Sequence, residues 1–120
     1  MNILSTINQQ QKQSLIRKNY SDIYAHELAH KTAGGQFAGG IVIEKNGDGI
    51  PVSGHVPIQM PVLNKKNPQE TINHADIVIR SAMAPDDPSP QDYKVAAEAR
   101  RIKSEAISYK AKNRHIDYYA

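Results

Sequence analysis

The sequence predicts an α+β fold in which a long N-terminal helix and one β-hairpin are followed by two C-terminal helices. Three observations lead to this fold. The first third has a helical period that ends at a glycine pair, the middle has β-branched residues around a turn, and the last half contains two helix starts led by proline. Because 120 residues have room for one core, we expect a single domain over residues 1–120, with frayed ends at 1–12 and 113–120.

The predicted first helix gathers several chemically distinct side chains on one face. Steps of three and four residues return to the same side of a helix, and here they connect Ile23, His26, Glu27, His30 and Ala33. We expect the helix to end at Gly34-Gly35, since glycine adopts the left-handed conformation that closes a helix at little cost.

The remaining elements follow from local signals. The run Ile41-Val42-Ile43 favours a strand, Asn46-Gly47-Asp48-Gly49 favours a tight turn, and a second strand is expected within residues 50–58. Asn67-Pro68 begins a helix that runs to about Ala84. Ser89-Pro90-Gln91-Asp92 begins the last helix, with Asp92 as a capping residue.

The composition excludes several classes of protein. No cysteine is present, so disulfides, thiolate zinc sites, iron–sulfur clusters and cysteine nucleophiles are ruled out. No apolar run is long enough for a membrane span, and the first residues lack a secretory signal, so we expect a cytoplasmic protein. The net charge is only +3, and aromatic residues make up 6%, so we do not expect nucleic acid as a partner. The sequence leaves the oligomeric state open.

The residues His26-Glu27-Leu28-Ala29-His30 form an H-E-x-x-H motif inside the first helix. Residues four apart differ by about 40° around the axis and about 6 Å along it, so two imidazoles can converge on one cation. Zinc binds imidazole nitrogens and, in catalytic sites, keeps one position for water. Glu27 is placed to act on that water as a general base. The motif therefore predicts a zinc metallopeptidase that acts on a peptide or protein substrate.

A catalytic zinc site of this kind needs a third protein ligand. The extension typical of metzincins requires Gly at position 33 and His at position 36, and the chain has Ala33 and Gln36 there. Spacing alone leaves both His55 and Glu98 open as the third ligand, while Asp92 is the next alternative despite its expected role as a cap.

Longer stretches around the motif resemble a known family. The likeness begins at His26-Glu27-Leu28-Ala29-His30 and continues through residues 31–40, Val52-Ser53-Gly54-His55-Val56, residues 68–72, residues 84–92 and residues 95–97. With these motifs the chain resembles the SprA-related family, whose members are regarded as bacterial metalloproteases on the strength of the same signature. The resemblance implies a small zincin-like metallopeptidase that binds Zn²⁺.

One departure from the family pattern bears on the third ligand. Family members usually have Gly-Gly-Glu-Val where this chain has Ser53-Gly54-His55-Val56, and Glu and His are both zinc donors. At the position of Glu98 the family often has Gln, which is a poor ligand. The predicted site is therefore His26, His30 and His55 as metal ligands with Glu27 as the catalytic base.

Two rival functions remain at this point. The same residues could bind zinc in a non-catalytic binding or interaction protein. More remotely, the basic last helix could serve a small nucleic-acid-binding module.

Overall fold

The computed structural model describes residues 3–114 and has the predicted order of elements. These elements are α1 (Ile3–Gly34), a short 3-10 helix η1 (Gly35–Phe37), β1 (Val42–Lys45), β2 (Pro51–His55), α2 (Pro68–Ala82) and α3 (Pro90–Arg114). Helix α1 already begins at Ile3, within the segment 1–12 that the sequence suggests is frayed. Residues 115–120, which belong to the other expected frayed segment, lie outside the described residues.

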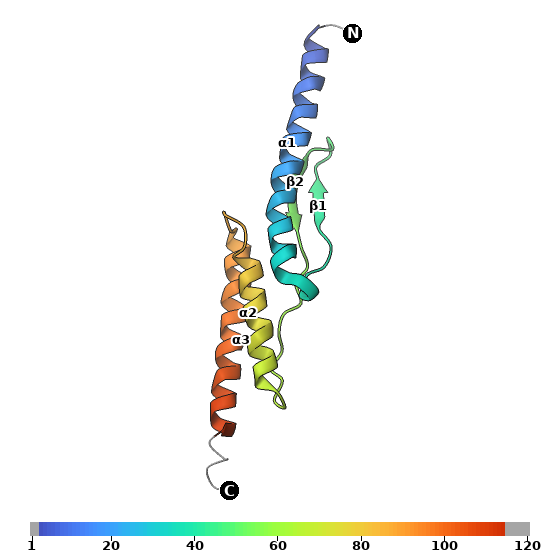
Figure 1. The fold of residues 1–120 in the computed structure, drawn as a ribbon. Coiled ribbons are helices and arrows are strands. Elements are labelled where there is room, and N and C mark those ends of the chain that lie inside the picture. Colours follow the sequence, from blue (N-terminus) through green and yellow to red (C-terminus); the bar gives the residue numbers. More distant parts are fainter. Residues whose placement is uncertain (1–2, 115–120) are drawn as a thin grey trace.

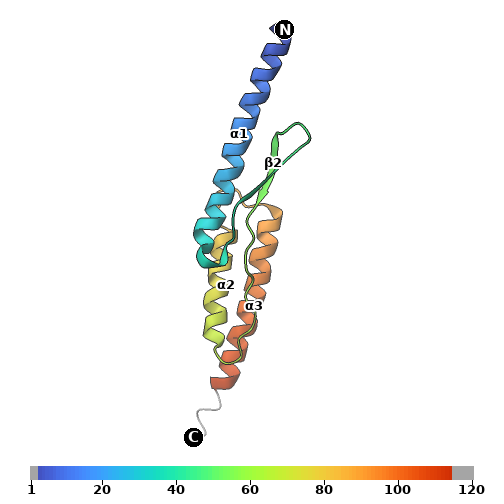
Figure 2. The same cartoon turned by 90° about the vertical axis from the view of Figure 1, so that its right-hand side faces the viewer.

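The elements form two pairs that overlap at their ends. The hairpin β1–β2 lies along α1, while α2 and α3 pack against each other (Figure 1). Figure 2 shows that the C-terminal end of α1 reaches the end of the helix pair where α2 finishes and α3 begins. The N-terminal part of α1 extends beyond the hairpin. None of the helices in residues 3–114 is long and apolar enough to cross a membrane.

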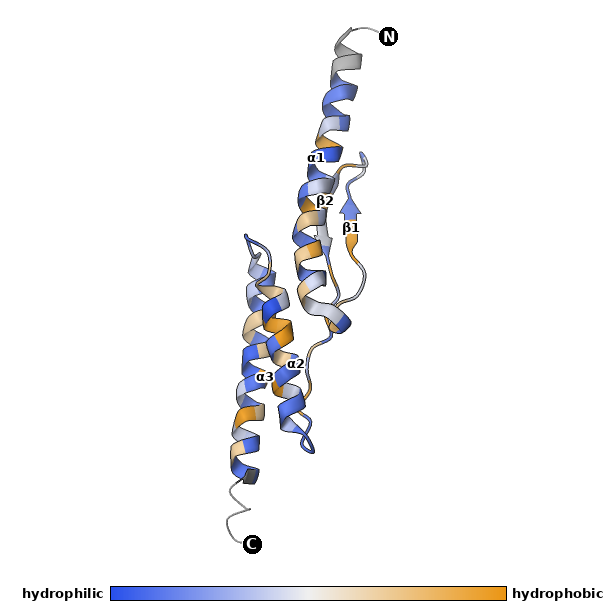
Figure 3. Cartoon of the chain, viewed as in Figure 1, coloured by the Kyte–Doolittle hydropathy of each residue, from blue (hydrophilic) through white to orange (hydrophobic). Residues whose placement is uncertain are grey.

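The core lies mainly between α2 and α3. Its buried side chains are small or medium-sized aliphatic groups, namely Ile72, Ala75, Val78, Ala82, Ala96, Ala99, Ile102 and Ala106. The alanines let the two helix backbones approach closely. Figure 3 shows that apolar residues also occupy the C-terminal half of α1, whereas its N-terminal half is mostly hydrophilic. The half of α1 that carries the H-E-x-x-H motif is therefore the half that packs against the rest of the chain.

Glycines at the end of α1 determine how it meets α2. Gly35 has a φ of +52°, which confirms the predicted end of the helix at the glycine pair. A Cβ on Gly34 would lie 2.8 Å from the Cβ of Ala38 and 3.0 Å from the Oγ of Ser81. The absence of a side chain at Gly34 thus allows α1 to approach the last turn of α2.

The hairpin has the predicted turn and packs closely on α1. Strands β1 and β2 are antiparallel, with Ile43 opposite Gly54, and the turn between them lies within the predicted Asn-Gly-Asp-Gly segment. A Cβ on Gly54 would lie 2.6 Å from Cγ2 of Ile23 and 2.9 Å from Cγ of Glu27. Only glycine therefore lets β2 lie this close to the motif-bearing face of α1.

Candidate metal centre

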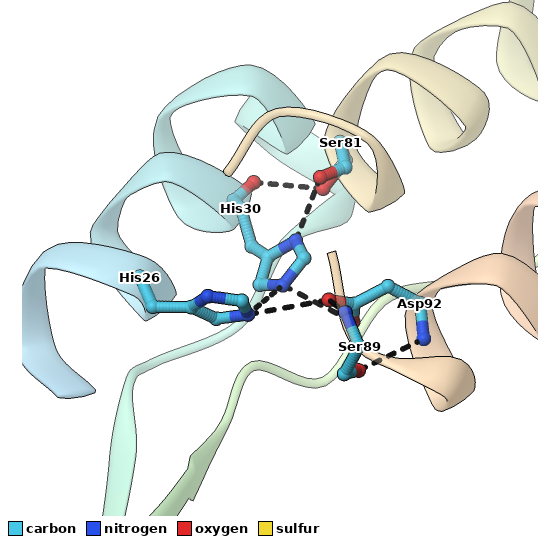
Figure 4. A network of polar contacts seen from close by, with 5 residues as sticks. All are labelled: His26, His30, Ser81, Ser89 and Asp92. Atoms are coloured by element: carbon cyan, nitrogen blue, oxygen red, sulfur yellow. Dashed lines mark hydrogen bonds and ion pairs between the residues drawn. The ribbon is translucent and has the colours of Figure 1, made fainter. Parts of the chain in front are cut away.

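Three side chains of the types that bind metals, His26, His30 and Asp92, converge where the end of α1 meets the start of α3. The Nε2 atoms of His26 and His30 are 3.2 Å apart. The two carboxylate oxygens of Asp92 extend this pair, with Oδ2 3.2 Å from Nε2 of His26 and Oδ1 3.2 Å from Nε2 of His30 (Figure 4). The side chains of His30 and Asp92 are 10% and 15% exposed, and that of His26 is 28% exposed. The centre is therefore partly enclosed but retains access from solvent.

His30 has its ring fixed by the end of α2. Its Nδ1 lies 2.7 Å from the main-chain carbonyl oxygen of Ser81, and because a carbonyl oxygen can only accept, Nδ1 carries the hydrogen and donates it. The hydroxyl of Ser81 in turn donates to the main-chain carbonyl of His30 at 2.7 Å. A histidine that binds a metal commonly donates its second ring nitrogen to a carbonyl in this way, which directs the other nitrogen at the metal.

Asp92 is held by the first turn of α3. The main-chain N–H of Ser89 donates to Oδ2 of Asp92 at 2.8 Å, and the main-chain N–H of Asp92 donates to Oγ of Ser89 at 3.1 Å. This reciprocal pair is a capping box, and Pro90 occupies the first helical position after it. The predicted capping role of Asp92 is confirmed, and the same carboxylate also faces both histidines of α1.

The lone pairs that converge at this centre favour a bound cation. With Nδ1 of His30 as a donor to Ser81, a neutral His30 ring presents a lone pair at Nε2, and the carboxylate of Asp92 also presents lone pairs. A hydrogen on Nε2 of His26 can be donated either to Nε2 of His30 or to Oδ2 of Asp92, but not fully to both. Positive charge at the centre, from a metal ion or from an additional proton, therefore stabilises this arrangement.

Glu27 occupies the position beside these donors that a general base requires. It is 6% exposed, and one of its carboxylate oxygens lies within 4.8 Å of the ligand nitrogens of His26 and His30. Among residues 8–113, whose side chains the structure describes, no hydrogen bond or ion pair engages this carboxylate, and no fully enclosed side-chain polar atom lacks a partner. Its oxygens therefore face the cleft that Glu27 helps to line, where they are free to interact with a bound molecule.

The cleft beside the metal centre has a volume of about 500 Å³. One side is formed by the motif-bearing face of α1, and the opposite side by α2 and the start of α3. The strand β2 and the segment that follows it close a third side. The three converging side chains are thus reached from a pocket of ordinary ligand-binding size.

Residues 4–117 match the sequence model of the SprA-related family. The chain belongs to the SprA-related family. This match covers nearly the whole chain and includes every residue of the metal centre. Comparison with curated proteins and with solved structures found no match.

His55, the predicted third ligand in this member of the SprA-related family, lies at the rim of the same cleft. Its Nδ1 is 3.6 Å from Oε1 of Glu44 across the hairpin, and its side chain is 54% exposed. Side chains alternate along a strand, so the contact of Gly54 with α1 directs His55 away from that helix. The prediction that His55 binds the metal stays a prediction, and the carboxylate nearest to both histidines is that of Asp92.

The other alternative, Glu98, faces solvent on α3. Arg101 donates from Nη2 to Oε1 of Glu98 at 2.7 Å, and this hydrogen bond lowers the pKa of the Glu98 carboxyl below its usual value. With Glu98 engaged by Arg101, the structure does not bring it to the two histidines. The sequence ranks Asp92 behind His55 as a third ligand, because its capping signal already explains its presence by local geometry.

Proposed function

We propose that this protein is a zinc-dependent peptidase in which His26, His30 and Asp92 hold the metal and Glu27 is the general base. The observation that carries this proposal is the convergence of three donor side chains: Nε2 of His26 and of His30 lie 3.2 Å apart, and each lies 3.2 Å from one of the two oxygens of Asp92. Beside them is the buried carboxylate of Glu27, which has no hydrogen-bond or ion-pair partner among the described side chains. The cleft next to them supplies the space for a substrate.

The donor set fits zinc in both chemistry and spacing. Two imidazole nitrogens and one carboxylate oxygen are among the ligands that catalytic zinc sites use. Donors at about 2.0–2.1 Å from a tetrahedral zinc ion lie about 3.3 Å from each other. The 3.2 Å between Nε2 of His26 and Nε2 of His30 is close to this value, and each of these nitrogens lies 3.2 Å from one oxygen of Asp92. Three protein ligands leave one position open, as hydrolysis requires.

Each side chain has a distinct task in the proposed reaction. Bound zinc supplies Lewis acidity and makes a water molecule more acidic. Glu27 accepts the proton of the attacking water and passes it to the nitrogen of the leaving amine, so its carboxylate ends the cycle as it began. Ser81 and Ser89 hold His30 and Asp92 in orientation through the contacts described above.

The replacement Glu27→Gln tests the division of roles between binding and catalysis. We expect the variant to bind zinc with an affinity within a few-fold of the parent, because the amide leaves the three ligands in place. Peptide hydrolysis is expected to fall by at least about 100-fold, since a neutral amide cannot accept the proton. Zinc binding is measured by calorimetry, and turnover by mass spectrometry of a peptide mixture.

Glu105→Gln provides the matched control, because Glu105 is exposed on α3 and lies outside the lining of the cleft. It should leave both the zinc affinity and the peptide turnover unchanged. Turnover that survives in Glu27→Gln would remove Glu27 from the mechanism. Zinc binding without any turnover in the parent would favour the alternative of a non-catalytic zinc-binding protein.

A further inference from the structure

Two sides of the cleft carry aliphatic side chains. We call this set the apolar wall: Val56 and Ile58 from the segment after β2, Val78 and Ala82 from α2, and Val95 from α3. Val78 and Ala82 are buried under the surface of α2, while the other three remain partly exposed to the cleft. Partly exposed aliphatic groups inside a concavity favour an apolar occupant, because contact with it removes their surface from water.

The charges around the cleft indicate which part of a chain can enter it. Among the described residues that line it, the ionisable ones are His26, Glu27, His30, His55 and Asp92, with no lysine or arginine. Recognition of a terminal carboxylate uses a cationic side chain, and recognition of a terminal amine uses a spare carboxylate. Both lining carboxylates already have a role in the proposed site, so neither chain terminus has a dedicated partner here.

We infer that the cleft binds an internal segment of a peptide chain and seats an aliphatic side chain of that segment against the apolar wall, next to the bond that is cleaved. This inference rests on the proposed function and names its substrate class. A volume of about 500 Å³ accommodates only a short stretch of chain, so one side chain against the wall accounts for much of the selectivity.

Hydroxamates test this inference without relying on turnover, because the hydroxamate group chelates an accessible zinc ion. The zinc-loaded protein is titrated by calorimetry with acetohydroxamate and with two peptide-like hydroxamates that differ in one side chain, isobutyl or hydrogen. We expect the isobutyl compound to bind at least tenfold more tightly than its glycine counterpart. A free carboxylate at the end of the compound, compared with an amide, should change the affinity by less than twofold.

Val95→Asp places a charge in the apolar wall and should weaken the isobutyl compound at least tenfold, while acetohydroxamate binds within twofold of the parent. If the aspartate variant fails to fold, Val95→Thr takes its place, because threonine keeps the shape of the side chain. It should weaken binding of the isobutyl compound several-fold. The matched control is Val62→Asp, because Val62 is 82% exposed and lies outside the cleft. It should change neither affinity.

Two results would overturn the inference while leaving the proposed function intact. Equal affinity of the isobutyl and glycine compounds, with acetohydroxamate bound, would show that the wall does not select a side chain. A tenfold gain from a free terminal carboxylate would show that the cleft recognises a chain end. Failure of all three hydroxamates to bind the zinc-loaded protein would overturn the proposed function, and the inference with it.

Discussion

His30 connects α1 to both neighbouring helices through the two nitrogens of one ring. Nδ1 donates to the last turn of α2 at Ser81, and Nε2 faces Asp92 at the first turn of α3. A side chain held on both sides in this way loses little further freedom when a metal binds, which favours affinity. His26 contacts α3 only through Asp92 and is more exposed, so of the two proposed ligands His30 is the better ordered.

Gly54 controls the position of Glu27, although it contributes no chemistry itself. In Gly54→Ala the new Cβ would lie 2.9 Å from Cγ of Glu27 and 2.6 Å from Cγ2 of Ile23, so α1 and β2 must move apart. We expect a loss of about 1–3 kcal/mol in the free energy of unfolding, as is usual for overpacking. Peptide turnover should fall at least tenfold while zinc still binds, because the strain falls on the base and not on the ligands.

The control for this variant is Gly40→Ala, since a Cβ at Gly40 meets nothing within 4 Å and its φ is not positive. It should leave stability and turnover close to those of the parent. The free energy of unfolding is measured by chemical denaturation, and turnover by the peptide assay. Equal behaviour of the two variants would contradict the positioning role of Gly54.

At the scale of elements, the start of α3 carries both a helix cap and a ligand of the proposed metal site. Ser89→Ala removes the hydroxyl that accepts the main-chain N–H of Asp92. We expect a loss of about 1 kcal/mol in stability from the missing cap. Zinc affinity should fall by about tenfold, the lower end of the range for lost contacts behind a ligand. Calorimetry and denaturation together measure both effects.

Ser104→Ala is the matched control for this experiment, because Ser104 is exposed further along α3. It should leave zinc affinity unchanged. If Ser89→Ala loses stability but keeps the zinc affinity of the parent, the cap does not orient Asp92.

Local signals in the sequence were sufficient to predict the elements but not the complete site. The i, i+4 spacing of His26 and His30 reports on one helix, so it can be interpreted without knowing the rest of the fold. Asp92 lies 66 residues beyond His26 and approaches it only because α1 and α3 both pack against α2. The prediction of His55 as third ligand rests on an exchange of donor residues within the family. It does not account for the alternation of side chains along β2, which directs His55 away from α1.

For the molecule as a whole, the metal centre is the main polar connection between α1 and α3. Both histidines belong to α1 and Asp92 belongs to α3, while the larger apolar contact of α3 is with α2 (Figure 1). A metal bound at this junction links the pair formed by α1 and the hairpin to the pair formed by α2 and α3. Metal binding should therefore stabilise the whole chain and not only the site.

Thermal unfolding measures this effect. Zinc at a concentration 100 times its Kd should stabilise the fold by about 2.7 kcal/mol, which corresponds to a rise in Tm of about 10 °C for a domain of this size. A chelator should reverse the rise. Magnesium, which prefers sites made of oxygen ligands, should leave Tm unchanged. An unchanged Tm under saturating zinc would contradict the role of the centre as a link between the helices.

The most direct test of the central claim is the zinc content of the purified protein, measured by elemental analysis beside the variants Asp92→Ala and His55→Ala. We predict about one zinc ion per chain in the parent and in His55→Ala, and a large loss in Asp92→Ala. Circular dichroism checks that each variant keeps its helices. Zinc retained in Asp92→Ala but lost in His55→Ala would show that His55 on the hairpin, and not Asp92, is the third ligand. A parent that binds no zinc, even after incubation with it, would contradict the metal centre itself.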